Sequence, residues 1–209
     1  MPDDPDPTLE LAAAGDPAAW RALVDRHRPR LRRMVELRLD PRLRGRIDPS
    51  DVLQEAYLDV ARGLADYLRN PALPFFLWLR LLTARKLQAL HRHHLGTKMR
   101  DAGREVSLYR GALPQASSVS LAAQLLGRLT SPSQAAVRAE LQLRVQEALN
   151  GMDPLDREVL ALRHFEQLSR AETAQVLGIE EPAAAKRYIR ALKRLKDALA
   201  DMPGGLEGL

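Results

Sequence analysis

Cationic side chains near the C-terminus have the composition and spacing of a surface that binds a polyanion. Five bases fall within nine residues, with no acid among them: Lys186, Arg187, Arg190, Lys193 and Arg194. Such side chains bind phosphate oxygens and the edges of bases in the major groove of DNA. The alternative is an amphipathic helix whose bases only contact solvent, as most charge runs do. The elements that precede these bases distinguish the two.

Residues 169–195 are predicted to form two short helices joined by a tight turn. Ser169 and Glu172 have the spacing of a capping box at the start of the first helix. Gly178 can end that helix in the left-handed conformation, and Pro182 suits the first turn of the next. The second helix is predicted to bury Ala184, Tyr188, Ala191 and Leu195. A cationic second helix in this arrangement is typical of a helix-turn-helix, so we favour DNA binding.

Composition restricts the classes to which the protein can belong. The net charge of +5 favours a polyanionic partner. The chain has no cysteine, which excludes disulfides and thiolate metal sites. No apolar run approaches the ~20 residues of a membrane helix, and the acidic, proline-rich N-terminus is unlike a signal peptide. We expect a cytoplasmic protein that associates with DNA and does not insert into a membrane.

Helical spacing of apolar residues extends through most of the chain, and no stretch alternates as a strand does. We predict an all-α protein with two small helical domains, residues 8–95 and 136–202, the second containing the helix-turn-helix. A flexible linker is predicted over residues 96–135, which are rich in glycine, proline and serine, with room for a short helix over 121–129. A linker of that length inside one compact domain would be unusual, which favours two domains.

One predicted helix of the first domain carries an acidic ridge. Asp16-Pro17 and Asp48-Pro49 are start signals for two helices. The helix after Asp48 is predicted to bury Val52, Leu53, Ala56, Tyr57 and Val60. This leaves exposed the acidic ridge, which we define as Asp51, Gln54, Glu55 and Asp59. The ridge would repel DNA and suit a basic protein partner, although charge pattern alone favours an ordinary solvated face.

The last helix of the first domain places aromatic rings beside cations. The rings are Tyr67, Phe75, Phe76 and Trp78. The cations are predicted on the side of the helix opposite its core positions, and they are Arg80, Arg85, Lys86, His91, Arg92, His93 and His94. Unpaired bases stack on rings while phosphates contact lysine and arginine. The alternative is that the rings belong to the core, which we favour for Phe76 and Trp78. Phe76, Leu79, Leu82 and Leu90 are the predicted core positions of this helix.

The histidines of this helix invite comparison with a metal site. His91 and His94 share a helix face, but no carboxylate lies nearby and Arg92 disfavours a bound cation. The sequence has no glycine-rich phosphate loop, serine elbow or paired catalytic carboxylates. We expect no metal site, no cofactor, no catalytic residue and therefore no enzyme.

Three segments together resemble the extracytoplasmic-function (ECF) sigma factors, the compact promoter-specificity subunits of bacterial RNA polymerase. They are DPSDVLQEAYLDV (48–60), FFLWLRLLTARKLQALHRHH (75–94) and MDPLDREVLALRHFEQLSRAETAQVLGIEEPAAAKRYIRALKRL (152–195). The resemblance implies that the first segment docks on the clamp helices of the largest polymerase subunit. It implies that the second melts and reads the −10 element and that the third reads the −35 element.

The resemblance also implies roles for individual residues. The −35 element would contact Glu181, Pro182, Ala183, Lys186, Arg187, Arg190 and Lys193. The −10 strand would contact Tyr67, Arg69, Asn70, Trp78, Arg85, Lys86, His91 and Arg92. Core RNA polymerase would bind Asp51, Gln54, Glu55 and Asp59. Arg85 stands where the family often has asparagine. The family often has an aromatic residue in the preceding loop near Arg69, where Tyr67 is the nearest ring, so base identity at the −10 element is left open.

We therefore expect a sigma factor that binds core RNA polymerase and directs promoter-specific transcription initiation. The alternative is a stand-alone helix-turn-helix regulator that binds duplex DNA without polymerase. The acidic ridge and the aromatic, basic helix distinguish them, because a simple regulator needs neither. The sequence leaves open the promoter, the regulon, the inducing signal and the existence of an anti-sigma protein.

Overall fold

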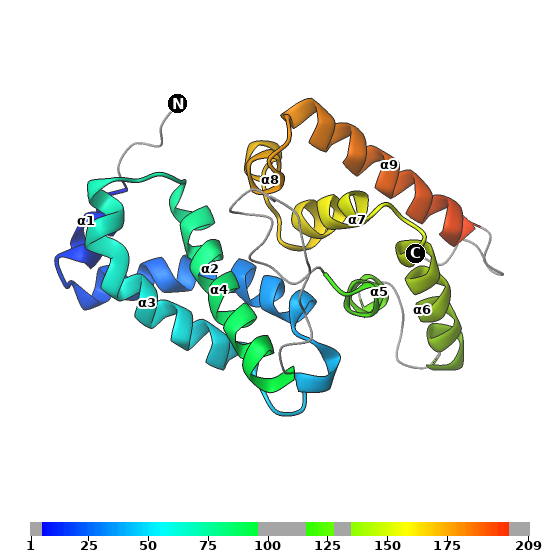
Figure 1. Ribbon diagram of the computed structural model, residues 1–209, viewed down its shortest axis with the longest axis horizontal. Helices are drawn as coiled ribbons and strands as arrows, with labels where there is room; N and C mark the ends of the chain where they lie inside the picture. Colours follow the sequence, from blue (N-terminus) through cyan, green and yellow to red (C-terminus); the bar gives the residue numbers. More distant parts are fainter. Residues whose placement is uncertain (1–5, 96–115, 128–134, 201–209) are drawn as a thin grey trace. The chain divides into compact units, whose positions relative to one another are not determined.

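The computed structural model describes residues 6–95, 116–127 and 135–200, and these are helical with no strand among them. The all-α prediction is confirmed. The chain divides into two compact units, Met1–Pro114 and Gln115–Leu209, and each is described by itself (Figure 1).

Local start signals determine where most helices of the N-terminal unit begin. Its elements are α1 (Pro7–Ala13), α2 (Pro17–Arg38), the 3-10 turn η1 (Pro41–Leu43), α3 (Pro49–Arg69) and α4 (Phe75–Leu95). Each of the first four follows an aspartate, and that carboxylate accepts a hydrogen bond from the backbone N–H two residues on, at 2.7–3.0 Å. Proline has no N–H to satisfy in a first turn, and aspartate satisfies the next one. The predicted starts at Asp16 and Asp48 are confirmed.

The core of the N-terminal unit lies among α2, α3 and α4, which pack against one another. Its buried side chains include Leu31, Met34, Val35, Val52, Leu53, Ala56, Val60, Phe76, Leu79 and Leu87. The residues from α3 are those predicted, with Tyr57 half-buried. In α4, Phe76 and Leu79 are confirmed as core, whereas Leu82 and Leu90 are only half-buried.

Two cations of α4 do not lie where the sequence analysis put them. Arg80 and His91 were expected on the outward basic side, but they are 3% and 6% exposed. They are eleven residues apart, which is about three helical turns, and they share the inward face with Phe76 and Leu87. His91 Nε2 accepts a hydrogen bond from the backbone N–H of Asp40 at 3.2 Å. Burial of His91 and the hydrogen bond at its acceptor nitrogen count against the predicted contact with DNA.

The C-terminal unit has its own core. Its elements are α5 (Ser118–Gly127), α6 (Ala135–Asn150), α7 (Pro154–Leu160), the π-helical turn η2 (Ala161–Phe165), α8 (Arg170–Leu177) and α9 (Glu181–Ala200). Helix α5 packs on α6, and α9 contacts α6, α7 and α8. Leu121, Val145, Leu149, Val159, Phe165 and Ala191 are completely buried.

The segment predicted as a linker is described only in part. Helix α5 lies inside it, close to the short helix expected over residues 121–129, and belongs to the C-terminal unit. Residues 96–115 and 128–134 lie outside the described residues. The predicted domain limits, 8–95, 96–135 and 136–202, stay predictions. None of the described helices combines the length and apolar character needed to cross a membrane.

The environment of His91 predicts that the N-terminal unit loses stability at mildly acidic pH. Burial lowers the pKa of His91, opposed by the nearby Asp40 carboxylate and reinforced by Arg42. The unfolded chain then binds a proton that the folded chain does not. Stability is complete above the ordinary histidine pKa of about 6.5 and falls as the pH drops toward the lowered value.

Thermal unfolding at about pH 7.5 and about pH 5.5 tests this, since the two conditions bracket that pKa. His91→Gln cannot titrate, so its melting temperature should change less between the two conditions than that of the wild type. His94→Gln is the matched control, because His94 is exposed. An unaltered pH dependence in His91→Gln would contradict the assignment.

Candidate nucleic-acid and polymerase interface

The predicted helix-turn-helix is present in the C-terminal unit as α8, a tight turn and α9. Ser169 Oγ accepts a hydrogen bond from the Glu172 N–H at 3.1 Å, and the Glu172 carboxylate accepts one from the Ser169 N–H at 2.6 Å. Gly178 has a φ of 61°, the left-handed conformation that ends α8. All three features are as predicted, because each depends only on residues within one helical turn.

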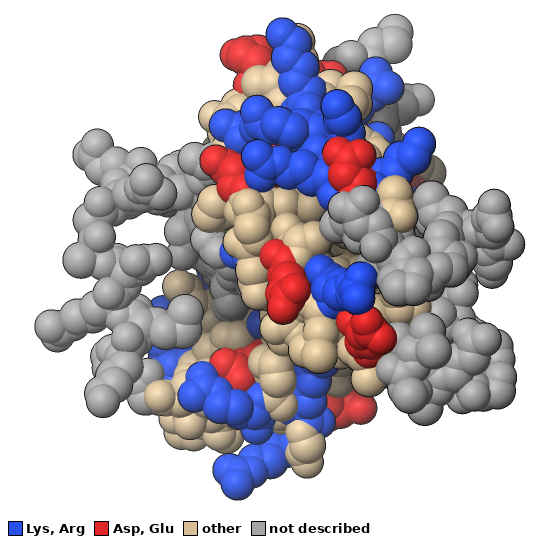
Figure 2. Space-filling model, turned by 90° about the vertical axis from the view of Figure 1, so that its right-hand side faces the viewer, with Lys and Arg blue, Asp and Glu red and all other residues tan. Residues whose placement is uncertain are grey.

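Helix α9 separates a buried stripe from a cationic outer face. Ala184, Ala191 and Leu195 are 6% exposed or less, which confirms the predicted stripe, and Tyr188 is half-buried. The exposed −35 candidates are Glu181, Pro182, Ala183, Lys186, Arg190 and Lys193. Lysine and arginine side chains gather over α9 at the top of the view in Figure 2. This surface has the sign of charge that duplex DNA requires.

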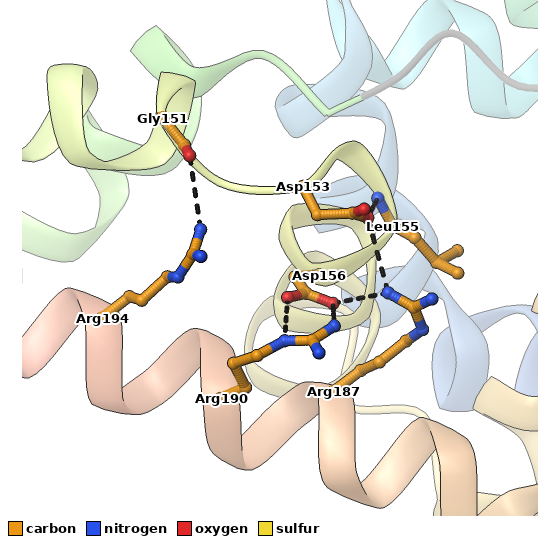
Figure 3. Close-up of polar contacts among 7 residues, drawn as sticks. All are labelled: Gly151, Asp153, Leu155, Asp156, Arg187, Arg190 and Arg194. Atoms are coloured by element: carbon orange, nitrogen blue, oxygen red, sulfur yellow. Dashed lines mark hydrogen bonds and ion pairs between the residues drawn. The ribbon is translucent and has the colours of Figure 1, made fainter.

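A buried carboxylate holds two of the predicted DNA contacts (Figure 3). The Asp156 side chain is 1% exposed. Arg190 donates to both of its oxygens, from Nε at 2.5 Å and from Nη2 at 2.6 Å, and Arg187 donates from Nη1 at 2.8 Å. Arg187 also reaches Asp153 at 3.4 Å. One carboxylate of α7 therefore fixes one flank of α9.

The electrostatics of this cluster keep Asp156 ionised. The hydrogen bond from Arg190, followed by that from Arg187, holds the pKa of the Asp156 carboxyl below its usual value, against the effect of burial. A buried carboxylate is stable only when paired in this way. Asp156 was not among the residues predicted from the sequence, although the sequence carries a signal for it. Asp156 is three and four residues before the buried Val159 and Leu160, so it is a carboxylate on an apolar face.

The acidic ridge of α3 is largely exposed, but two of its members are paired with a lysine of α4. Asp51, Gln54 and Glu55 are exposed and Asp59 is half-buried. Lys86 Nζ lies 2.9 Å from Asp59 and 3.7 Å from Glu55. A predicted DNA contact and two predicted polymerase contacts thus meet in one ion-pair cluster.

The aromatic residues before and within α4 form a packed cluster. Tyr67 stacks on Trp78 with ring centroids 4.6 Å apart, and Phe75 meets Tyr67 edge-on at 5.5 Å. The Tyr67 hydroxyl donates to the Leu73 carbonyl at 2.8 Å. Burial raises the pKa of Tyr67. A methyl group at Gly63 would lie 3.2 Å from Trp78, so glycine permits this close approach. Phe76 belongs to the core, as we favoured. Trp78, for which we also favoured the core, is half-buried, as is Tyr67.

The other −10 candidates lie on the surface. Arg69, Asn70, Arg85 and Arg92 are exposed, and Arg69 is ion-paired with Asp66. No three histidine, aspartate or glutamate side chains form a group able to hold a metal ion within the part of the chain that the structure describes.

Removing the Asp156 charge should destabilise the C-terminal unit. Asp156→Asn removes the negative charge that pairs with both arginines and replaces the acceptor of Arg190 Nε by an NH2 group, so we expect a loss of about 2–3 kcal/mol in the free energy of unfolding. Because its pKa is lowered, Asp156 stabilises the fold above the ordinary carboxyl pKa of about 3.9, and this contribution is lost as the pH falls through the lowered value.

Denaturant unfolding near neutral pH and near pH 3 measures both effects, and the difference between wild type and Asp156→Asn should shrink in acid. Asp153→Asn is the control, because asparagine keeps the helix cap and only the longer contact to Arg187 is weakened. Wild-type stability of Asp156→Asn near neutral pH would show that the cluster contributes nothing.

Comparisons with known proteins agree with this geometry. Residues 142–195 match the family described as "Sigma-70, region 4". The chain is 30% identical over 194 residues to the ECF RNA polymerase sigma factor SigD of Mycobacterium tuberculosis, covering 93% of this chain and 83% of that protein. It is 29% identical over 200 residues to the RNA polymerase sigma factor CnrH of Cupriavidus metallidurans, covering 95% and 96%.

A solved structure of CnrH in complex with the cytosolic domain of CnrY is similar to the chain, with a TM-score of 0.53 and 25% identity, covering 93% of this chain and 97% of that one. These similarities extend across both units, so a stand-alone helix-turn-helix regulator is not favoured. The chain belongs to the ECF family of RNA polymerase sigma factors, which direct promoter-specific transcription initiation.

Proposed function

We propose that the C-terminal unit binds the −35 element as duplex DNA, while the N-terminal unit binds core polymerase and the melted −10 strand. This assignment of roles to the two units is supported by two surfaces of opposite charge, one on each unit. The outer face of α9 is cationic, and the exposed ridge of α3 is acidic. DNA is attracted by the first and repelled by the second.

At the −35 element we infer different roles for the lysines and the arginines. Lys186 and Lys193 are exposed on the outer face of α9, where they would bind phosphates. Arg187 and Arg190 are bound to Asp156, which supports a role in orienting the helix. Arg190 is 51% exposed and uses Nε and Nη2 for Asp156, so its remaining N–H groups are available to DNA. The first turn of α9, with Glu181, Pro182 and Ala183, would approach the base edges.

At the −10 element we propose that an unpaired base lies beside the aromatic cluster. Tyr67 and Trp78 are already stacked on each other, so a base would meet their exposed edges. Arg69, Asn70, Arg85 and Arg92 would hold the strand. Lys86 is paired with Asp59, which supports a role in positioning the acidic ridge for polymerase, and we also propose that it contacts a phosphate of the −10 strand.

Three further proposals follow from membership in the sigma-factor family. We propose that the protein acts in the cytoplasm, has no catalytic activity of its own and uses residues 96–135 to tether its two domains. CnrH was solved with the cytosolic domain of CnrY. A protein that binds this factor, such as an anti-sigma protein, is therefore a candidate partner.

The acidic ridge is expected to be the main anchor on core polymerase. The double variant Asp51→Lys, Glu55→Lys would set like charges against a basic partner surface. It should weaken binding by several kcal/mol, of order a hundredfold or more. Pull-down of core polymerase at fixed salt measures this. The double variant Glu10→Lys, Asp25→Lys has the same change in net charge at exposed positions of α1 and α2 and should bind normally. Equal binding of core polymerase by both double variants would show that the interface does not lie at the acidic ridge.

The exposed arginines of the −10 surface are expected to act in strand opening. A duplex hides the bases that Arg69 and Arg85 would read, so Arg69→Ala and Arg85→Ala should fail on duplex promoters and recover on a pre-melted template. Permanganate footprinting and run-off transcription on both templates measure this. Arg21→Ala, at an exposed position of α2, is the control. If the bubble template does not rescue the two variants, their assigned role in melting is incorrect.

A further inference from the structure

The outer face of α9 carries an exposed isoleucine among its cations. Ile189 is 66% exposed, the largest exposed fraction among the large hydrophobic residues of the described chain. It lies three residues after Lys186 and four before Lys193, so it is a helical neighbour of both. Any surface that meets these two lysines must therefore also meet Ile189.

Other small or apolar side chains lie on the outer face between its charged groups. Pro182 and Ala183 are exposed, and Ala185 is half-buried, one turn before Ile189. The arginines that could form bidentate contacts with guanine lie on the flank that meets α7, where Asp156 holds them. Apolar side chains and lysines therefore occupy the centre of the outer face.

A shallow hollow beside Ile189 extends this surface toward α8. It is lined by Arg163, Arg170, Ala184, Ala185, Tyr188 and Ile189. Arg170 is exposed at the first position of α8, and Arg163 lies over the Tyr188 ring, 5.6 Å from its centroid. The apolar centre thus has cations on more than one side, which fits a polyanion better than an apolar protein partner.

In the major groove, the one apolar group that identifies a base is the 5-methyl group of thymine. We propose that Ile189 reads the methyl group of a thymine in the −35 element and is a specificity-determining residue of this sigma factor. The inference rests on the proposed role of α9 in −35 recognition. It adds that selectivity at one base pair comes from apolar contact and not from hydrogen bonds.

Replacement of thymine by uracil tests the proposal, because uracil lacks only the methyl group and keeps every hydrogen-bonding atom. Holoenzyme is assembled from the full chain and core polymerase, and a promoter is mapped by run-off transcription. Each thymine of the −35 element, on either strand, is then replaced in turn by deoxyuracil, and competition binding is measured. The wild type should lose about fourfold in affinity at one position, as expected for one buried methyl group.

Ile189→Ala should bind the thymine and uracil promoters equally at that position. Ile189→Val should keep part of the difference. Leu143→Ala is the matched control, because Leu143 is 62% exposed on α6 and should leave the difference unchanged.

Three results would overturn the proposal: no uracil effect in the wild type, a −35 element without an A·T pair, or an undiminished effect in Ile189→Ala. A loss of polymerase binding by Ile189→Ala with the uracil effect intact would also overturn it and would identify a protein contact. In each of these cases promoter-specific transcription by the wild type would leave the proposed function standing. Failure of that transcription would instead reject the proposed function, and this inference with it.

Discussion

The ion-pair cluster around Asp156 is the interaction on which the DNA-facing surface depends. A carboxylate that is 1% exposed must be paired, and its partners are two arginines of α9, one of which donates to both oxygens. The two hydrogen bonds from Arg190 to Asp156 restrain the rotation of α9 about its own axis as well as its distance from α7. Together with the buried stripe of Ala184, Ala191 and Leu195, the cluster holds α9 in the orientation in which Lys186, Ile189 and Lys193 face solvent.

A similar constraint acts in the N-terminal unit. Lys86 of α4 pairs with Asp59 and Glu55 of α3, so the acidic ridge has a cation beside it. The aromatic cluster of Tyr67, Phe75 and Trp78 joins the end of α3 to the start of α4 in the same way, through ring packing over Gly63. In both units, charged and aromatic residues proposed for partners also position the helices that carry them. Their substitution is expected to alter stability and binding together, which is why exposed controls are needed.

The sequence by itself determined the helix starts, the helix-turn-helix and the exposure of most of the acidic ridge. The Asp-Pro pairs, the Ser169–Glu172 capping box and the left-handed Gly178 are local devices, and each is complete within one helical turn. The buried stripe of α9 follows from helical spacing alone. Such features need no knowledge of the neighbouring helices, so sequence analysis located them correctly.

Only the tertiary structure decided which polar residues are buried and what they bind. Asp156 meets arginines 31 and 34 residues away, and His91 meets the backbone of Asp40 across 51 residues. Periodicity shows that two residues share a helix face, but it does not show which other helix covers that face. His91 therefore resembled a surface cation, and Arg187 and Arg190 resembled free DNA contacts, until the packing of α4 and α9 assigned them partners.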